Sequence, residues 1–207
     1  KDQIAEAVAM GDDELMEKFF SGESFSEAEL TRGVRLGVRN GEITPVFSGS
    51  ALQSIGIERL MDLILKYFPT YGESGSYTAI GSDGEPVELE TNEKESLSAQ
   101  VFKTIVDPFV GRISYLKVLS GVLSSDSTVY NANKEKPEKI SSVFIIKGKH
   151  QTAAGKLFTG DIGAVVKLQN TQTNDTLCEK GKPVKAEAIA FSEPMYAQAV
   201  FPKSKND

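Results

Sequence analysis

The sequence predicts an α+β protein in which a short αβ segment precedes an antiparallel β-barrel. Three observations lead to this prediction. Apolar residues recur at helical spacing up to about residue 70, and beyond it they alternate with a period of two. The later apolar runs are short, and turn residues rather than helical patterns separate them. Closing such strands into a barrel would remove the edges that they otherwise leave exposed.

Two amphipathic helices are expected first. Acidic residues precede an apolar stripe at residues 15–20, and carboxylates suit the positive end of a helix dipole. Ser26 and Glu29 then have the spacing of a capping box, apolar residues follow at every fourth position, and Asn40-Gly41 ends the helix. We interpret both stripes as core packing.

A strand, a turn and a third helix are expected next. Residues 43–47 form an apolar run of strand type, and residues 48–51 are a turn of small residues. A further apolar stripe runs from Ile57 to Phe68 and ends at Pro69, which cannot continue a helix. The parallel partners that such a strand needs are missing from this sequence.

The pattern after about residue 71 predicts hairpins and short strands. Asp83-Gly84 marks a hairpin turn between polar, extended flanks. Strands are expected after it in the segments 97–106, 111–120, 127–132, 140–147, 161–168 and a last group around 186–191. Together they predict a closed antiparallel barrel of roughly 110 to 130 residues.

Composition narrows the class of protein. The 207 residues are 40% hydrophobic and carry a net charge of −6, which is ordinary for a soluble globular protein. No apolar run approaches the roughly 18 residues of a membrane span, and the start of the sequence lacks the apolar region of a signal peptide, so we expect a cytoplasmic protein. Residues 101–207 carry 15 basic and 10 acidic side chains. This surplus of positive charge could attract a polyanion, or it could belong to a lysine-rich face that only water contacts.

The sequence offers little for catalysis. Its single cysteine, Cys178, excludes an internal disulfide, and its single histidine, His150, leaves no histidine pair for zinc. No G-x-S-x-G elbow accompanies His150, which we interpret as a solvated loop residue rather than a member of a catalytic triad. We expect no catalytic residue and no metal site.

Five motifs, in order, resemble the second domain of bacterial elongation factor G and the segments that follow it. They are D-P-F-V-G-R-I-S-Y-L-K-V-L-S-G at 107–121, T-G-D-I-G-A at 159–164, T-N-D-T-L-C at 173–178, F-S-E-P at 191–194 and V-F-P-K-S-K at 200–205. Residues 12–18 and 41–51 resemble the end of the same family's nucleotide domain. The resemblance implies a β-barrel of the translation-protein type preceded by an α/β remnant of a P-loop GTPase domain.

The resemblance also implies a division of the chain and a function. Residues 1–70 would be the C-terminal part of the GTP-binding domain, and residues 71–207 the barrel, domain II, with a core at about 95–200. The chain would be an internal fragment of a translational GTPase that promotes movement of tRNA and mRNA through the ribosome. GTP and Mg²⁺ are then expected in the full-length protein, and no cofactor in this fragment.

Two residues fall on a nucleotide-binding motif of that family. Ser50 and Ala51 match the fifth guanine-nucleotide motif, where a turn of small residues lets backbone N–H groups approach the base. The sequence contains no G-x-x-x-x-G-K-[ST] loop for the phosphates. In the imitation of N-K-x-D at 133–136, Lys136 stands where a carboxylate is needed. We therefore expect the fragment alone neither to bind GTP well nor to hydrolyse it.

In this family the second domain is a non-catalytic barrel that packs on the nucleotide domain and contacts small-subunit ribosomal RNA. The expected partners are therefore the ribosome, the rest of the GTP-binding domain and domain III, with no membrane. Basic side chains that face phosphates supply salt-sensitive affinity. The candidates for contact with ribosomal RNA are Arg112, Lys117, Lys134, Lys136, Lys147 and Lys149.

Other interpretations stay open. A ribosomal protection protein or a release-factor GTPase shares this two-domain plan, and a free-standing barrel that binds a small ligand or peptide has the same kind of fold. Three positions depart from the family's usual pattern. Asn174 stands in place of glycine, Lys117 stands where arginine is more frequent, and residues 145–151 look more like the divergent paralogues.

Overall fold

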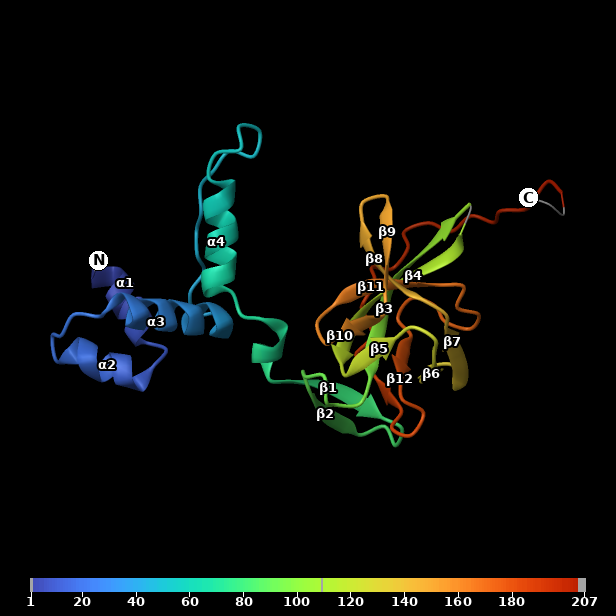
Figure 1. Cartoon of the computed structure of the whole chain (residues 1–207), viewed down its shortest axis with the longest axis horizontal. Helices are drawn as coiled ribbons and strands as arrows, with labels where there is room; N and C mark the ends of the chain where they lie inside the picture. The colour runs from blue at the N-terminus through green and yellow to red at the C-terminus, as the bar shows by residue number, and fades with distance from the viewer. Residues whose placement is uncertain (1, 109, 205–207) are drawn as a thin grey trace. The chain divides into compact units, whose positions relative to one another are not determined.

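The computed structural model of the chain describes residues 2–108 and 110–204. It contains two compact units. The first comprises the residues up to Tyr77 together with Glu90–Asn92, and the second comprises Thr78–Leu89 together with the residues from Glu93 onward. Helices form the first unit and strands form most of the second (Figure 1). In the described parts of the chain, no helix is long and apolar enough to cross a membrane.

The first unit is helical, as its apolar periodicity predicts. It contains α1 (Asp2–Ala9), α2 (Asp13–Phe20), α3 (Glu27–Asn40), α4 (Ile57–Tyr67) and the short 3₁₀ helix η1 (Tyr71–Ser74). The sequence interpretation did not identify α1. The other three α-helices lie where their apolar stripes indicated, and α4 ends just before Pro69.

The predicted helix signals are confirmed at the caps of α2 and α3. The N–H of Glu29 donates to Ser26 Oγ at 3.3 Å, and the N–H of Ser26 donates to Glu29 Oε2 at 2.7 Å, which completes the capping box. Asp12 caps α2 by accepting a hydrogen bond from the N–H of Leu15. Gly41 ends α3 in the left-handed conformation, with a φ of 77°.

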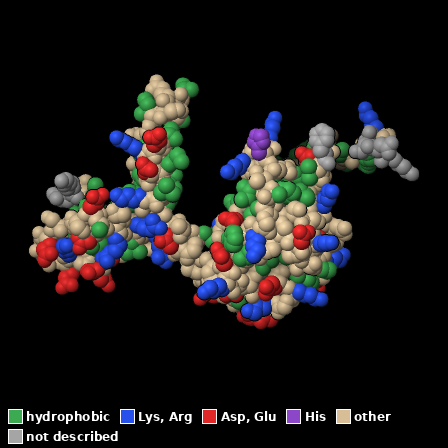
Figure 2. Space-filling view, in the orientation of Figure 1, with side chains coloured by type: hydrophobic (Ala, Val, Ile, Leu, Met, Phe, Trp, Pro, Cys, Tyr) green, Lys and Arg blue, Asp and Glu red, His purple; other side chains and the backbone are tan. Residues whose placement is uncertain are grey.

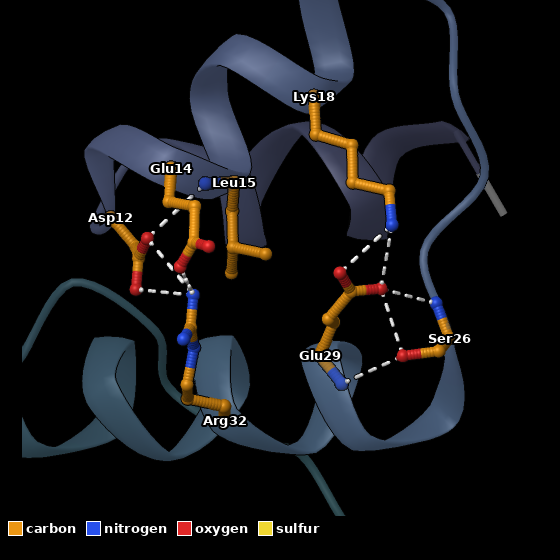
Figure 3. A network of polar contacts seen from close by, with 7 residues as sticks. All are labelled: Asp12, Glu14, Leu15, Lys18, Ser26, Glu29 and Arg32. Carbon is orange, nitrogen blue, oxygen red and sulfur yellow. Dashed lines mark hydrogen bonds and ion pairs between the residues drawn. The ribbon is translucent and has the colours of Figure 1, made fainter.

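Close packing and ion pairs join the first three helices. A Cβ at Gly33 of α3 would lie 2.2 Å from Val8 of α1, so only glycine lets these helices approach. Around this contact, Lys18 of α2 pairs with Glu29 of α3 at 2.8 Å, and Arg32 pairs with two acidic residues at the start of α2 (Figure 3). The hydrogen bonds from Lys18 and Ser26 lower the pKa of Glu29 to about 2.

The expected strand at residues 43–47 is absent, so this prediction was wrong. The segment is irregular, and in the described chain the neighbouring Ser50 and Ile55 make only an isolated bridge. A strand needs a partner for its backbone hydrogen bonds, and the helices around this segment provide none. Its apolar residues differ in their surroundings. Ile43 packs on Gly37 of α3, whereas Val46 is 93% exposed.

The second unit is built from antiparallel strand pairs, as predicted. Its strands are β1 (Ser76–Gly81), β2 (Pro86–Glu90), β3 (Ser98–Asp107), β4 (Gly111–Ser120), β5 (Val122–Ser124), β6 (Ser127–Asn131), β7 (Lys136–Ile140), β8 (Val143–Lys147), β9 (His150–Ala154), β10 (Lys156–Phe158), β11 (Ile162–Val166), β12 (Thr176–Cys178) and β13 (Val184–Lys185). Eight of them form one sheet in the order β7-β6-β12-β3-β4-β11-β8-β9. Two smaller sheets, β13-β1-β2 and β10-β5, complete the unit, and the predicted turn at Asp83-Gly84 joins β1 to β2.

Apolar residues of the long strands form the core of this unit. Leu116 and Val118 of β4, Val101 of β3 and Leu177 of β12 are completely buried. They belong to one cluster, whose buried members are Leu97, Ala99, Val101, Leu116, Val118, Leu123, Val129, Ile140, Val143, Leu157, Val165, Leu168 and Leu177. The antiparallel fold around one core agrees with the barrel-like fold that the alternation predicted. Among the described strands the end strands β7 and β9 of the large sheet do not pair with each other, so the predicted closure of the barrel is not formed.

The last predicted strand, around residues 186–191, is not formed. The sequence there is apolar enough for a strand, but side chains rather than a neighbouring strand bind its backbone. Ala186 donates to Thr176 Oγ1, and the carbonyl oxygen of Glu187 accepts from Gln100. His150 also differs from its predicted place in a loop, because it is the exposed first residue of β9.

Candidate nucleic-acid interface and nucleotide loop

Ser50 and Ala51 lie in a tight loop before α4. The N–H of Ser50 donates to the carbonyl oxygen of Ile55, and the N–H of Ile55 donates back to Ser50, both at 3.0 Å. A Cβ at Gly49 would lie 2.8 Å from the oxygen of Ile55, so glycine is required for this closure. The backbone of the loop therefore fixes its own shape.

The loop leaves backbone donors for a ligand. Within residues 2–108 and 110–204, the N–H groups of Ala51 and Leu52 donate no hydrogen bond, and both residues are exposed. Such donors fit the edge of a planar base. The sequence has no lysine-containing glycine loop for phosphates, and the described residues hold no group of three His, Cys, Asp or Glu side chains suited to a metal ion. The loop therefore offers two unused backbone donors, and this sequence supplies no phosphate-binding loop beside them.

The six basic candidates occupy three separate places on the second unit. They are Arg112 and Lys117 in β4, Lys134 and Lys136 at the turn between β6 and β7, and Lys147 and Lys149 at the end of the β8–β9 hairpin. The structure thus leaves the candidates in three places and does not unite them in one patch.

The two candidates in β4 do not act together. Arg112 is exposed and Lys117 is half-buried, and an odd spacing along a strand puts them on opposite faces. Arg112 has a different neighbour, because its carbonyl oxygen accepts a hydrogen bond from the N–H of Lys167 at 3.0 Å. Lys167 is exposed, and sequence reasoning missed it because it lies far from Arg112 in the chain.

Lys134 is held over a buried polar network. Its Nζ lies 4.0 Å from Asp175, whose side chain is 7% exposed. Asn131 lies beneath, donating from Nδ2 to Asp175 at 2.9 Å and to Thr171 at 3.1 Å. Its Oδ1 accepts from the N–H groups of Asn133 and Lys134. The carboxylate of Asp175 offsets part of the positive charge at this turn, so the turn attracts an anion less than its lysines suggest.

The end of the β8–β9 hairpin is free of such compensation. Lys147 pairs in register with His150, and Gly148-Lys149 forms a two-residue turn in which Gly148 has a φ of 59°. We call residues 147–150 the hairpin tip. Lys147, Lys149 and His150 are all exposed, and no acidic residue occurs anywhere from Lys139 to Gly160.

The hairpin tip also stands clear of the core. Every residue from His150 to Ala153 is exposed, so β9 lacks a buried face along most of its length. In Figure 2 the single histidine lies among basic side chains at the end of this hairpin. Among the described residues, neither tip lysine forms an ion pair. The run K-G-K-H was visible in the sequence, but its place on a projecting hairpin was not.

Comparison with known proteins finds similarity to elongation factor G over the whole chain, and a family model matches part of the second unit. A family model described as elongation factor G domain 2 matches residues 96–180. Elongation factor G from Ureaplasma urealyticum serovar 10 is 36% identical over all 207 residues, and elongation factor G from Ureaplasma parvum serovar 3 has the same identity and coverage. The chain spans 30% of the length of these curated relatives.

A solved structure supports the fold independently. A crystal structure of a protein from Thermus thermophilus aligns with 97% of this chain, with a TM-score of 0.68. The alignment covers 27% of that protein, and the two sequences are 23% identical. At this level of identity the match shows that the chains share a fold.

Proposed function

Since the chain is a relative of elongation factor G and carries that family's domain 2 at residues 96–180, we propose that it is part of a translational GTPase that moves tRNA and mRNA through the ribosome. The protein would act in the cytoplasm. In this proposal the second unit is a non-catalytic barrel that contacts small-subunit ribosomal RNA, the rest of the nucleotide domain and domain III.

The first unit would contribute to guanine binding through its loop. The N–H groups of Ala51 and Leu52 lie in a turn that two backbone hydrogen bonds between Ser50 and Ile55 close, and they are the donors that would meet the base. GTP supplies the phosphoryl group that is hydrolysed, with Mg²⁺ as its counter-ion. Residues outside this sequence would have to hold both, because this sequence lacks the phosphate-binding loop.

The single observation that carries the RNA contact is the hairpin tip. Two lysines and a histidine project from a two-residue turn, with no carboxylate nearby in the chain. RNA helices expose their phosphates along both strands, and each lysine that neutralises a phosphate releases counter-ions. A narrow basic projection reaches such a surface without requiring the barrel itself to fit a groove.

The experiment is a binding titration of the 207-residue chain on isolated small ribosomal subunits between about 50 and 200 mM salt. A double variant, K147A/K149A, removes both tip lysines. A matched control, K180A/K182A, removes two exposed lysines from another loop of the same unit and changes the net charge equally. We expect the tip variant to reduce the slope of log K against log salt by about 1.4 to 1.8, which corresponds to two phosphate contacts.

The control variant should keep the slope of the wild-type chain. Equal losses in both variants would show that the attraction follows net charge alone and not the tip. Binding that is insensitive to salt would favour a barrel that binds a ligand without phosphate contact. No binding at 50 mM salt would contradict RNA contact by this part of the protein.

A further inference from the structure

We call residues 186–191 the exit segment. At its start, side chains of the barrel hydrogen-bond its backbone, as a partner strand would otherwise do. The N–H of Ala186 donates to Thr176 Oγ1 at 3.0 Å. Gln100 Nε2 donates to the carbonyl oxygen of Glu187 at 2.6 Å. Thr176 and Gln100 lie opposite each other in β12 and β3, so the exit segment starts where two strands are paired.

Asn174 holds the segment at its next contact with two hydrogen bonds. Its Nδ2 donates to the carbonyl oxygen of Ile189 at 3.0 Å, and its Oδ1 accepts from the N–H of Ile189 at 2.8 Å. A carboxamide carries one acceptor and a donor group, as a peptide unit does. The side chain of Asn174 therefore makes with Ile189 the pair of bonds that an antiparallel strand residue would make.

The backbone of Asn174 is itself fixed. Its N–H donates to the carbonyl oxygen of Val101 at 2.7 Å, and its φ of 77° is left-handed, a conformation that asparagine tolerates better than most residues. The position thus combines a turn that would suit glycine with a side chain that glycine lacks. The turn needs only the φ, whereas the contact with Ile189 needs the carboxamide.

Little else restrains the exit segment beyond this point. Every residue from Glu187 to Ser204 is exposed, including Phe191 at 64%. Apolar burial holds the segment only in part, since Ala186 is buried and Ile189 is 36% exposed. The rest of its attachment depends on individual hydrogen bonds, each of modest net strength in contact with water. Loss of two of them should shift the equilibrium between attached and released segment.

We propose that Asn174 is a positioning residue that fixes the point at which the chain leaves the barrel. Its carboxamide keeps Ile189 attached, and release of the exit segment is a local opening that does not require the barrel to unfold. The proposal is independent of the function proposed above, because it concerns hydrogen bonds within the second unit alone.

The test compares Asn174→Gly with the unchanged 207-residue chain. Glycine adopts a φ of 77° without strain, so the barrel should be as stable as before or slightly more stable. The amide of Ile189 should exchange its hydrogen with solvent about 5 to 100 times faster, as expected for the loss of two hydrogen bonds. Asn174→Asp, which keeps an acceptor and loses the donor, should give an intermediate rate.

Two readouts separate local from global effects. Hydrogen exchange at Ile189 reports attachment of the exit segment, and the labelling rate of the buried thiol of Cys178 reports opening of the barrel. We expect faster exchange and unchanged labelling in Asn174→Gly. Unchanged exchange at Ile189, or exchange and labelling that increase together, would overturn the proposal.

Discussion

Replacing Asn131 by alanine should destabilise the barrel by about 2 to 4 kcal/mol. The side chain is completely buried and makes four hydrogen bonds, two as donor and two as acceptor. Each such bond contributes about 1 kcal/mol net, and a bond to a carboxylate contributes about 1.5 to 3 kcal/mol. The total is reduced because the turn N–H groups that lose their acceptor belong to exposed residues, which water can reach.

The remaining partners limit the loss further. Without Asn131, Asp175 Oδ2 still accepts from the N–H of Gln172 at 2.9 Å, and Thr171 still donates to Glu138 at 3.0 Å. Neither buried group loses every partner, so the loss of stability is smaller than that caused by leaving a buried charge without any partner. A change of this size is still a large fraction of the 5 to 15 kcal/mol by which domains are typically stable.

The assay is urea unfolding of the 207-residue chain, followed by pulse labelling of its single cysteine. Cys178 lies in β12 and is completely buried, so its labelling reports unfolding of the barrel and not of the helical unit. Gln172→Ala is the matched control. Gln172 lies in the loop that carries Thr171 and Asp175, but its side chain is exposed, so its replacement should change the free energy of unfolding by less than about 0.5 kcal/mol. A loss below about 1 kcal/mol for Asn131→Ala would refute the reasoning, because it would show that water replaces the network at little cost.

Two further predictions concern packing and pH. Gly163→Ala should destabilise the barrel by about 1 to 3 kcal/mol, because its new Cβ would lie 2.4 Å from Leu157, whereas Gly155→Ala has open space and should be neutral or stabilising in the same unfolding assay. Glu29 has a pKa of about 2 in the folded chain, below the 4.3 or so of an unfolded glutamate, mainly because Lys18 donates a hydrogen bond to it. Its contribution to stability is therefore present above about pH 4.3 and lost as the pH falls through about 2. Glu29→Gln should flatten the acid dependence of helical circular dichroism over that range, and an unchanged acid profile would contradict this account.

Local signals were enough to predict the parts of the fold that depend on neighbouring residues. The capping box of Ser26 and Glu29, the stop at Gly41 and the hairpin turn at Asp83-Gly84 all act within a few residues. The long strands β3 and β4 were also predicted, because their apolar alternation extends over ten residues each. By contrast, β12 and β13 have only three and two residues, too few for a period to be visible.

Features that join distant residues were not predictable in this way. Asn131 meets Asp175 only because β6 and β12 pair in the folded barrel. The same long-range contact brings Asp175 close to Lys134, which the sequence suggested as a free basic residue. The irregular exit segment has a related cause, because apolar patterning predicts a strand but does not reveal that side chains will bind its backbone.

The candidate RNA surface was predicted by composition and not by position. Lys147 and Lys149 were recognised as basic residues in a lysine-rich stretch, but the two-residue turn that projects them comes from the register of β8 and β9. Lys167 was missed because strand pairing, rather than adjacency in the chain, places it beside Arg112. The electrostatic potential of a site can therefore be predicted only once the fold is known, even when every charged residue can be read from the sequence.

The most direct test of the proposed RNA contact is site-specific cross-linking from the hairpin tip. A cysteine introduced by Lys149→Cys can carry a photo-activated cross-linker, and the native Cys178 is buried and so protected from labelling. A second chain, Lys182→Cys, places the same group on a different exposed loop. With isolated small ribosomal subunits, the account predicts cross-links to ribosomal RNA from position 149 and few from position 182. Equal yields from both positions, or cross-links from position 182 alone, would contradict it.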